Sequence, residues 1–278
     1  MNFLNKIYNY YFAFSINKIL FHFTLLFNGN IYSKLFNFYS LFYNSKNRII
    51  FRDRKYFCIE KKWIFSQKKV GLYAYGKGFD KRILELSSTY HLDKINFKDD
   101  DNIIDIGANN GDLYLCFKDK INYYGFEPSP EIFLNLKHNV PNQNIFNLGL
   151  WNKSNKDIDF YLSDEFGDSS IIPINKFSKK ISIKTTTLNE VIEKINSRIK
   201  LLKIEAEGAE PEILEGLSDK LNMVEYITID CGFERGVNQD STISECSNYL
   251  IKNNFSMVGF NNPRIVVLFK NNNLIYYI

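Results

Sequence analysis

The sequence of 278 residues predicts an α/β fold with a doubly wound, largely parallel sheet and an aromatic-rich helical extension before it. From residue 102 onward, short apolar runs typical of strands alternate with amphipathic stretches typical of helices. The run at 102–106 opens into a loop with Gly107 and Gly111, as the first strand of such a sheet should. The last two predicted strands, 255–260 and 264–270, are joined by Asn-Asn-Pro and are expected to form a hairpin.

The first segment, residues 1–47, is free of acidic residues and rich in Phe and Tyr. We expect two helices, at 3–27 and 31–43, broken at the Asn-Gly-Asn of 28–30. Two interpretations stay open. The segment is either an element that docks on a membrane surface or a protein partner, with basic side chains near anionic headgroups, or a helical layer packed on the following domain.

Residues 48–100 are expected to lead into the core of the fold. The stretch 55–75 alternates apolar and polar residues and predicts short strands. Asp80 then opens a predicted helix at about 80–90, with Ile83, Leu84 and Leu86 facing inward.

The main domain is predicted at 101–278, with Ser129 and Thr187 as helix caps and Pro130 at a first helical position. A polar loop is expected around 163–180. The expected strands are 102–106, 122–126, 144–148, 200–206 and 225–230, and the expected helices are 112–118, 130–139, 188–195, 211–217 and 242–253.

Composition and charge narrow the classes of function. Hydrophobic residues make up 45% and charged residues 24% of the chain, as in ordinary globular proteins. The first 52 residues hold six basic residues and no acid, and the remaining 29 basic and 31 acidic residues give 53–278 a net charge of −2. The main domain therefore has no nucleic-acid signature.

Cysteine usage and the N-terminal sequence predict the cellular compartment. The four cysteines show neither disulfide nor metal-ligand spacing, which indicates a reducing compartment. The N-terminus lacks a signal-peptide cleavage site, and the 15 uncharged residues between Lys18 and Lys34 are too few and too polar to span a bilayer. We expect a cytoplasmic protein, peripheral to the inner membrane surface if the first segment docks there.

Acidic residues recur where the predicted strands end. Asp105 lies at the end of the first strand and Glu127 follows the second, Glu205 and Glu207 lie on the fourth, and Asp230 ends the fifth. Buried strands of a parallel sheet should be almost wholly apolar, so this recurrence indicates a ligand site at the carboxyl edge of the sheet. For any one of these acids, capping of the following helix is the alternative.

The pattern favours S-adenosylmethionine over a dinucleotide. A pyrophosphate requires G-x-G-x-x-G, but Asn109 stands at the second glycine position, and Asp105 would repel phosphate. S-adenosylmethionine carries a sulfonium and an ammonium group, which suit carboxylates. Glu127, 16 residues after Gly111, is placed to accept both ribose hydroxyls.

Four motifs carry a family resemblance. DNIIDIGANNG, YYGFEPSP, TTTLNEVI and KIEAEGAEPEILEG, in this order and spacing, resemble the FkbM family of S-adenosylmethionine-dependent methyltransferases over about residues 75–270. The resemblance implies a class I methyltransferase fold, which is Rossmann-like with a seven-stranded sheet ending in an antiparallel hairpin. It also implies O-methylation of sugar or natural-product hydroxyls. Glu205 departs from the family, which more often has Asp there.

The expected cofactor-binding residues are Asp105, Gly107, Ala108, Asn109, Gly111, Glu127 and Pro128. The expected catalytic residues are Lys203, Glu205, Glu207 and Asp230.

Strand periodicity predicts Lys203, Glu205 and Glu207 on one side of the fourth strand, next to the first strand. We hypothesise that Glu205 or Glu207 orients and deprotonates an acceptor hydroxyl while Lys203 tunes the pair. The alternative is that Lys203 and Glu205 only neutralise each other. Ser169, Ser170 and Arg235 are expected on the acceptor side.

Other assignments stay open beside this one. Glu205 and Asp230 would form an incomplete metal site without a third ligand, so we expect no metal. The acceptor is expected to be a small molecule or a glycan, such as a surface-polysaccharide precursor. N-methylation on the same scaffold and a non-catalytic nucleoside-binding module are the alternatives.

Overall fold

The structure is a computed structural model that describes residues 23–24, 26–66, 72–117, 120–163 and 169–274. It divides into two compact units, residues 1–81 and 82–278. The helix expected at 3–27 lies almost wholly outside the described residues. No helix in the described ranges is both long and apolar enough to cross a bilayer.

The first unit packs one helix on a small antiparallel sheet. Helix α2 (Gly29–Leu41) begins two residues before the expected start, and the sheet has the order β1 (Ile49–Arg52), β2 (Lys55–Cys58), β3 (Trp63–Phe65). Asn37 of α2 holds Ile49 at both backbone groups: its amide donates to the Ile49 carbonyl over 2.9 Å and its oxygen accepts from the Ile49 N–H over 2.7 Å. The helix and the sheet edge are thereby joined.

The strands expected within 55–75 are confirmed only in part. Two strands, β2 and β3, form there, but Tyr73–Lys77 is a 3₁₀ helix and not a strand. Tyr75 is fully buried and its ring lies 5.1 Å from that of Phe65 and 4.7 Å from that of Phe79. A cluster of aromatic side chains thus replaces strand pairing in this stretch.

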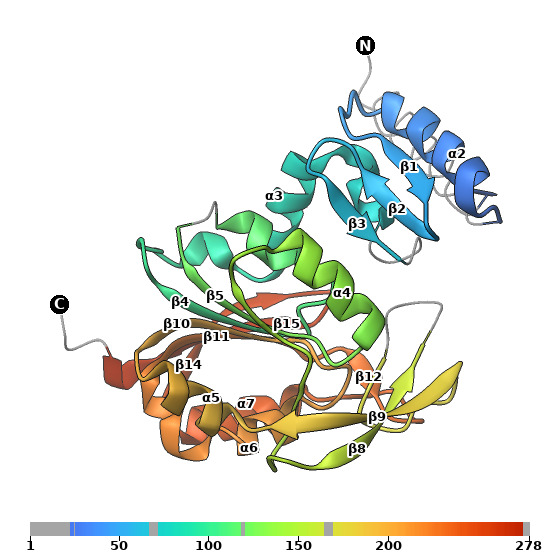
Figure 1. The fold of residues 1–278 in the computed structure, drawn as a ribbon. Coiled ribbons are helices and arrows are strands. Elements are labelled where there is room, and N and C mark those ends of the chain that lie inside the picture. The colour runs from blue at the N-terminus through green and yellow to red at the C-terminus, as the bar shows by residue number, and fades with distance from the viewer. Residues whose placement is uncertain (1–22, 25, 67–71, 118–119, 164–168, 275–278) are drawn as a thin grey trace, which may run out of the picture. The chain divides into compact units, whose positions relative to one another are not determined.

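The second unit is built on a seven-stranded sheet in the order β14-β15-β11-β10-β4-β5-β6 (Figure 1). All strands run parallel except β15, which is antiparallel to both its neighbours. The doubly wound sheet with a terminal antiparallel hairpin is therefore confirmed. The strands are β4 (Asn102–Ile106), β5 (Asn122–Phe126), β6 (Asn144–Phe146), β10 (Ile199–Ile204), β11 (Val224–Asp230), β14 (Phe255–Asn261) and β15 (Val266–Asn271).

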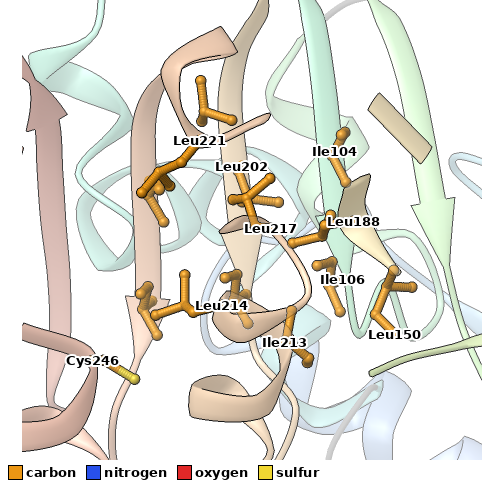
Figure 2. Packing of buried hydrophobic residues seen from close by; sticks show 14 of the residues in the cluster. Ile104, Ile106, Leu150, Leu188, Leu202, Ile213, Leu214, Leu217, Leu221 and Cys246 are labelled. Carbon is orange, nitrogen blue, oxygen red and sulfur yellow. The ribbon is translucent and has the colours of Figure 1, made fainter. Parts of the chain in front are cut away.

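Helices cover both faces of this sheet, with α4 on one face and α5, α6 and α7 on the other (Figure 1). The larger core cluster lies under α5, α6 and α7, where Leu188, Leu214 and Leu217 meet Ile104 and Leu202 of the sheet (Figure 2). The helices are α3 (Phe79–Thr89), α4 (Pro130–Asn139), α5 (Leu188–Ile195), α6 (Glu210–Glu215) and α7 (Ile243–Lys252), and short 3₁₀ helices cover Leu92–Lys94, Asp112–Cys116, Ser218–Met223 and Asn272–Leu274.

The helix starts follow the sequence signals unevenly. The Thr187 hydroxyl accepts a hydrogen bond from the Glu190 N–H over 3.3 Å, so the predicted cap of α5 is confirmed. Ser129 occupies the N-cap position of α4, but its side chain makes no capping bond. In α3, Leu86 is buried as expected, whereas Leu84 is 69% exposed, so the inward orientation expected for Leu84 is wrong.

Two small sheets in the second unit have no counterpart in the sequence-based assignment. β7 (Gly149–Leu150), β9 (Lys179–Thr186) and β8 (Asp157–Leu162) form a three-stranded sheet, and β12 (Phe233–Arg235) pairs with β13 (Asp240–Ser241). The expected polar loop at 163–180 is thus a connection between β8 and β9. Strand β9 has exposed Lys179, Lys180 and Lys184, so its first half resembles a solvated loop in composition, and buried residues occur only in its second half.

Candidate active site

The site lies at the carboxyl edge of the sheet, on the face covered by α4. Lys203 of β10 pairs in register with Asp105 of β4, and Asp105 pairs with Gly125 of β5. Residues in register on parallel strands point to the same face. Because Gly125 has no side chain, the row leaves room beside Asp105, and the ring of Tyr123 reaches across that glycine.

Lys203 is the centre of a buried ion-pair network. Its side chain is 3% exposed, and its Nζ lies 3.0 Å from Asp105 Oδ1 and 3.1 Å from Glu205 Oε2. The ammonium also donates to the carbonyls of Ile106 over 3.1 Å and Gly107 over 2.8 Å. Burial alone would lower the pKa of Lys203, but the two carboxylates raise it, so the ammonium stays charged.

Both carboxylate oxygens of Asp105 contact side chains of the protein. It is 1% exposed, and beside Lys203 its Oδ2 accepts a 2.5 Å hydrogen bond from the hydroxyl of Tyr123. Burial raises the pKa of Asp105, and the neighbouring Lys203 opposes that rise. The structure therefore joins Asp105 to Lys203 and Tyr123, and the rim of the site is formed by other carboxylates.

Glu205 follows the last residue of β10 and is held by three side chains. Its Oε2 accepts a 2.5 Å hydrogen bond from the hydroxyl of Tyr90, and its Oε1 pairs with Arg264 Nη2. Burial opposes ionisation, but the charges of Lys203 and Arg264 outweigh it and hold the pKa of Glu205 at about 2. A carboxylate this acidic is a poor base near neutral pH.

Arg264 connects Glu205 to Asp230. Its Nε lies 2.6 Å from Asp230 Oδ2, while its Nη2 contacts Glu205 and, at 3.4 Å, the hydroxyl of Tyr90. Asp230 Oδ1 accepts from the Gly232 N–H over 3.1 Å. Burial and the nearby Glu205 raise the pKa of Asp230, while Arg264 lowers it.

The guanidinium of Arg264 thus lies where the two acids would have met a metal ion. Among the described residues, no three His, Cys, Asp or Glu side chains are grouped to hold one.

Glu207 lies in a tight turn beyond the strand. Since β10 ends at Ile204, the expected alignment of Glu207 with Lys203 and Glu205 on one strand face is wrong. Glu207 has φ +53° and Gly208 has φ +99°, both left-handed. The turn is fixed by Glu210, whose Oε1 accepts from the Ala206 N–H over 2.9 Å and the Gly208 N–H over 3.1 Å.

Two residues expected on the acceptor side support this turn. The hydroxyl of Ser170 donates to the carbonyl of Glu207 over 2.7 Å. The guanidinium of Arg235 binds both carboxylate oxygens of Glu212, over 2.9 and 2.6 Å, and also the carbonyl of Gly208. Ser169 accepts from the Ser163 N–H over 2.9 Å, away from the turn. Ser170 and Arg235 therefore stabilise the backbone of the EGAE turn, residues 207–210, by donating to its carbonyl groups.

Glu234 was not recognised from the sequence and lies near the turn of Glu207 in the structure. It lies on β12, next to Arg235, whose Cα is 2.5 Å from where a Cβ on Gly208 would be. Burial, followed by the charges of Asp230 and Glu205, raises the pKa of Glu234 to about 8. Its only signal in the sequence is its position, four residues after Asp230.

The glycine loop approaches β10 closely. At Gly107, with φ +70°, a Cβ would lie 2.0 Å from the carbonyl oxygen of Glu205, so no other residue fits without a shift. The N–H groups of Gly107 and Ala108 both donate to the carbonyl of Phe126 over 3.0 Å, and the N–H of Asn109 donates to Glu127 Oε2 over 3.0 Å. Three successive amides are thereby taken by protein acceptors and are not offered to a phosphate.

Glu127 is anchored by backbone donors on both oxygens. Besides the Asn109 N–H, the Ser129 N–H donates to its Oε1 over 2.9 Å. It is 7% exposed, and burial raises its pKa to about 7 against these hydrogen bonds. The amide of Asn147 donates to the carbonyls of Glu127 over 2.8 Å and Pro128 over 3.0 Å, which fixes the turn before α4.

A network of buried asparagine side chains also supports the glycine loop, and the sequence did not predict it. The Asn110 side chain donates to Asn109 Oδ1 over 2.5 Å and accepts from the amide of Asn135 over 3.1 Å. Asn139 donates to the Asn110 carbonyl over 2.9 Å. Asparagines are frequent in this chain, so these three positions carried no distinguishing signal. Gly111, with φ +92°, then closes the loop.

Comparison with known proteins agrees with the site chemistry. The methyltransferase FkbM domain matches residues 105–256, more than half of the chain. The hexuronic acid methyltransferase AglP of Haloferax volcanii is 29% identical over 140 residues, which cover 48% of this chain and 56% of AglP. The chain thus spans about half the length of this curated relative.

Solved structures with a similar fold include two methyltransferases. The ribosomal protein L11 methylase of Lactobacillus delbrueckii subsp. bulgaricus has a TM-score of 0.41 at 11% identity, covering 69% of this chain and 78% of its own. The magnesium protoporphyrin IX methyltransferase of Synechocystis PCC 6803, solved with bound SAM, has a TM-score of 0.38 at 10% identity, covering 69% and 77%. At these scores the fold assignment depends on the strand order and the family match. The chain belongs to the FkbM family of S-adenosylmethionine-dependent methyltransferases.

Proposed function

We propose that this protein transfers a methyl group from S-adenosylmethionine to a hydroxyl of a sugar or glycan, with the donor bound over the carboxyl ends of β4, β5 and β10. The strongest support is that the backbone N–H groups of Gly107, Ala108 and Asn109 already donate hydrogen bonds to protein acceptors. A phosphate-binding loop leaves such N–H groups open, whereas a donor without phosphate does not need them.

The residues at the site fit such a donor. Glu127 is held by two backbone donors, so its carboxylate is preorganised to accept hydrogen bonds from the two ribose hydroxyls. When bound, the donor supplies a methyl group already activated by a positively charged sulfur. Close to it, the carboxylates of Glu205, Asp230 and Glu207 outnumber the cationic groups that neutralise them, which favours a cation over an anion.

The catalytic residues take separate roles in this proposal. Lys203 and Arg264 fix Glu205 as a permanent carboxylate, which orients the acceptor but does not remove its proton. Glu207 lies outside that network and is the candidate base. Asp105 holds Lys203 in place from beneath. The chain thus positions the acceptor oxygen and receives its proton, which is what methyl transfer requires from the protein.

The choice of a sugar acceptor has separate support. AglP, the relative matched over 140 residues, is named as a hexuronic acid methyltransferase. A sugar hydroxyl has to lose its proton during methylation, so a carboxylate base is useful there. N-methylation of an amine is the alternative, since a net-negative site also suits a protonated amine.

Calorimetric titration tests the proposal at its first step. We expect heat of binding with S-adenosylmethionine and none with NAD or ATP, and we expect the Glu127→Gln variant to bind the donor at least tenfold more weakly. Incubation of the loaded enzyme with hexuronic acids and with amino sugars should release adenosylhomocysteine only with the true acceptor class. Binding of NAD or ATP in place of the donor would refute the proposal, and binding with no release for either class would leave a nucleoside-binding module.

A second proposal concerns the first unit. We propose that α2 lies against an anionic membrane surface. The helix exposes Ile31 and Phe38, at 56% and 59%, next to the exposed Lys34, and its C-cap residue Phe42 is 65% exposed. The first 52 residues carry six basic residues and no acid, which is the charge expected for contact with anionic lipid.

Flotation with liposomes tests this docking. We expect the protein to float with vesicles that contain phosphatidylglycerol and to remain at the bottom with neutral phosphatidylcholine vesicles. The double variant Phe38→Ser and Phe42→Ser should lose flotation, whereas Phe177→Ser, an exposed Phe of the second unit, should not. Absence of flotation with either vesicle would leave a protein partner or the protein's own core as the occupant of this face.

A further inference from the structure

We propose that Tyr90 is a positioning residue that fixes the carboxylate plane of Glu205 and thereby determines which hydroxyl of the acceptor sugar is methylated. This inference rests on the proposed function, in which Glu205 orients the acceptor. Tyr90 directly follows α3 and is 4% exposed. It lies outside the motifs that carry the family resemblance, and the sequence assigned it no role at the site.

The partners of the Tyr90 hydroxyl set the direction of both its hydrogen bonds. Glu205 is paired with two cations and is ionised, so it can only accept, and the hydroxyl donates to its Oε2 over 2.5 Å. A guanidinium can only donate, so the hydroxyl accepts from Arg264 Nη2 over 3.4 Å. The hydroxyl hydrogen therefore has a single position, and it points at the carboxylate.

The ring of Tyr90 contacts the same two cations that bind this carboxylate. Lys203 Nζ lies 5.6 Å and Arg264 Cζ 5.7 Å from the ring centroid, each over the ring. The face of an aromatic ring attracts cations at such distances. Both cations also form ion pairs with Glu205, so the ring, the cations and the carboxylate hold one another in place.

The last hairpin fixes the backbone on both sides of Tyr90. The side-chain amide of Asn261 on β14 donates to the carbonyls of residues 88 and 89, over 2.9 Å each. His91 is 4% exposed, and its Nε2 lies 3.3 Å from the carbonyl oxygen of Val266 on β15. The segment that carries Tyr90 is thus bound to the sheet before and after it, which leaves the hydroxyl little freedom to move.

The Glu205 carboxylate has one hydrogen-bonding position left for a ligand. Its Oε2 receives the Lys203 ammonium and the Tyr90 hydroxyl, and its Oε1 receives Arg264. A carboxylate accepts about four hydrogen bonds, so the remaining position is on Oε1. Lys203 and Tyr90 are 3% and 4% exposed, whereas the Arg264 side chain is 47% exposed, so Oε1 is also on the open side.

An acceptor hydroxyl on Oε1 anchors the sugar ring. Because Glu207 is the candidate base for the reacting hydroxyl, the hydroxyl bound to Glu205 is a neighbouring one on the same ring. In the transfer, the reacting oxygen bonds to the methyl carbon as the carbon–sulfur bond breaks and leaves its electron pair on sulfur. The proton of that hydroxyl passes to Glu207, while Glu205 stays ionised. The acceptor class is therefore a sugar with adjacent hydroxyls.

Tyr90 keeps this anchor pointing in one direction. The terminal torsion of a glutamate is broad, so a carboxylate held by two flexible cationic chains alone can rotate. The buried hydroxyl adds a third contact from a fixed position and defines the carboxylate plane. Methyl transfer requires the acceptor oxygen to be aligned with the methyl carbon. The direction of the Oε1 anchor thus decides which neighbouring hydroxyl is aligned.

Product analysis of the Tyr90→Phe variant tests this role. The variant keeps the ring and its cation contacts and removes only the hydroxyl. With S-adenosylmethionine and the methyl glycoside of glucuronic acid as the probe, the wild type should yield one positional isomer of the methyl ether. Tyr90→Phe should yield a second isomer as roughly a tenth or more of the product, because it loses a hydrogen bond to a charged group. NMR of the products identifies the methylated position.

Tyr123→Phe is the matched control. The Tyr123 hydroxyl also donates to a carboxylate over 2.5 Å, but that carboxylate, Asp105, is 1% exposed and closed to an acceptor. This variant removes the same group on the other side of Lys203 and should keep a single isomer, whatever its total activity. A single, unchanged isomer from an active Tyr90→Phe variant would overturn the inference.

A double-mutant cycle in urea unfolding tests the contact without any acceptor, and it also decides the case of an inactive Tyr90→Phe variant. The stability lost in Tyr90→Phe should fall by roughly half when Glu205 is already replaced by Gln, since a hydrogen bond to a neutral amide is weaker than one to a carboxylate. Equal losses in both backgrounds would contradict the inference. Absence of S-adenosylmethionine binding by the wild type in calorimetry would refute the proposed function instead.

Discussion

Of the glycines in the described residues, Gly107 is the one at which replacement by Ala should damage the site most. The new Cβ would lie 2.0 Å from the Glu205 carbonyl oxygen, where real Cβ contacts stay above about 3.0 Å. The loop or the end of β10 must therefore move by about 1 Å. Such a movement would strain two hydrogen bonds. One is donated by the Glu205 N–H to the Ile106 carbonyl over 3.2 Å, and the other by the Lys203 ammonium to the Gly107 carbonyl over 2.8 Å.

The magnitude follows from these contacts. A left-handed backbone costs an alanine roughly 1–2 kcal/mol relative to glycine. Loss of one backbone hydrogen bond adds about 1 kcal/mol, and loss of one bond from a buried ammonium adds roughly 1.5–3 kcal/mol. We expect the Gly107→Ala variant to lose about 4 kcal/mol of unfolding free energy and most of its affinity for S-adenosylmethionine.

Gly236 is a matched control for this substitution. It has φ +68° against +70° at Gly107, but a Cβ there would meet its nearest neighbour, Ile172 Cγ2, only at 3.6 Å. Gly236→Ala should therefore cost only the conformational part, roughly 1–2 kcal/mol. Urea unfolding followed at Trp151, with Trp63 replaced by Phe in both proteins, measures the difference within the second unit. Equal losses in the two variants would refute the close-approach argument.

Three further predictions concern the charged groups. Lys203→Met should lose roughly 3–5 kcal/mol at pH 7, since Asp105 and Glu205 stay buried without it, and urea unfolding should show a smaller loss at pH 4. Because the pKa of Glu127 is raised to about 7, its carboxylate forms only above that pH, so calorimetry should show tighter donor binding at pH 8 than at pH 6. Arg264→Met should raise the pKa of Glu205 and lower donor affinity, and Arg264→Lys should restore part of it.

The sequence was most informative where local signals and burial agree. β4, β5, α4 and α5 have the predicted bounds, since a short, mostly apolar or aromatic run, a Pro at a first helical position or a Thr cap marks each of them. Glu127 could be located because it follows directly on β5. Such features depend on residues close together in the chain.

Most of what was missed depends on contacts distant in sequence. Arg264 and Tyr90 complete the Glu205 network from residues 59 and 115 positions away. The sequence pattern indicated for Arg264 only the first position of the last predicted strand. The buried contacts of Asp105 with Lys203 and Tyr123 could not be foreseen from the sequence, and its role in donor binding stays a prediction. Glu207 lies outside the strand because β10 ends at Ile204, two residues before the expected end at 206.

The position of Arg264, next to the start of β15, links the charge balance of the site to completion of the sheet. β15 is inserted between β11 and β14, so the guanidinium reaches Glu205 and Asp230 only when the final strand has paired. A chain cut before residue 264 would retain every family motif and still present two uncompensated acids at its centre. The last hairpin therefore contributes to the charge balance of the candidate site through Arg264, far along the chain from the glycine loop.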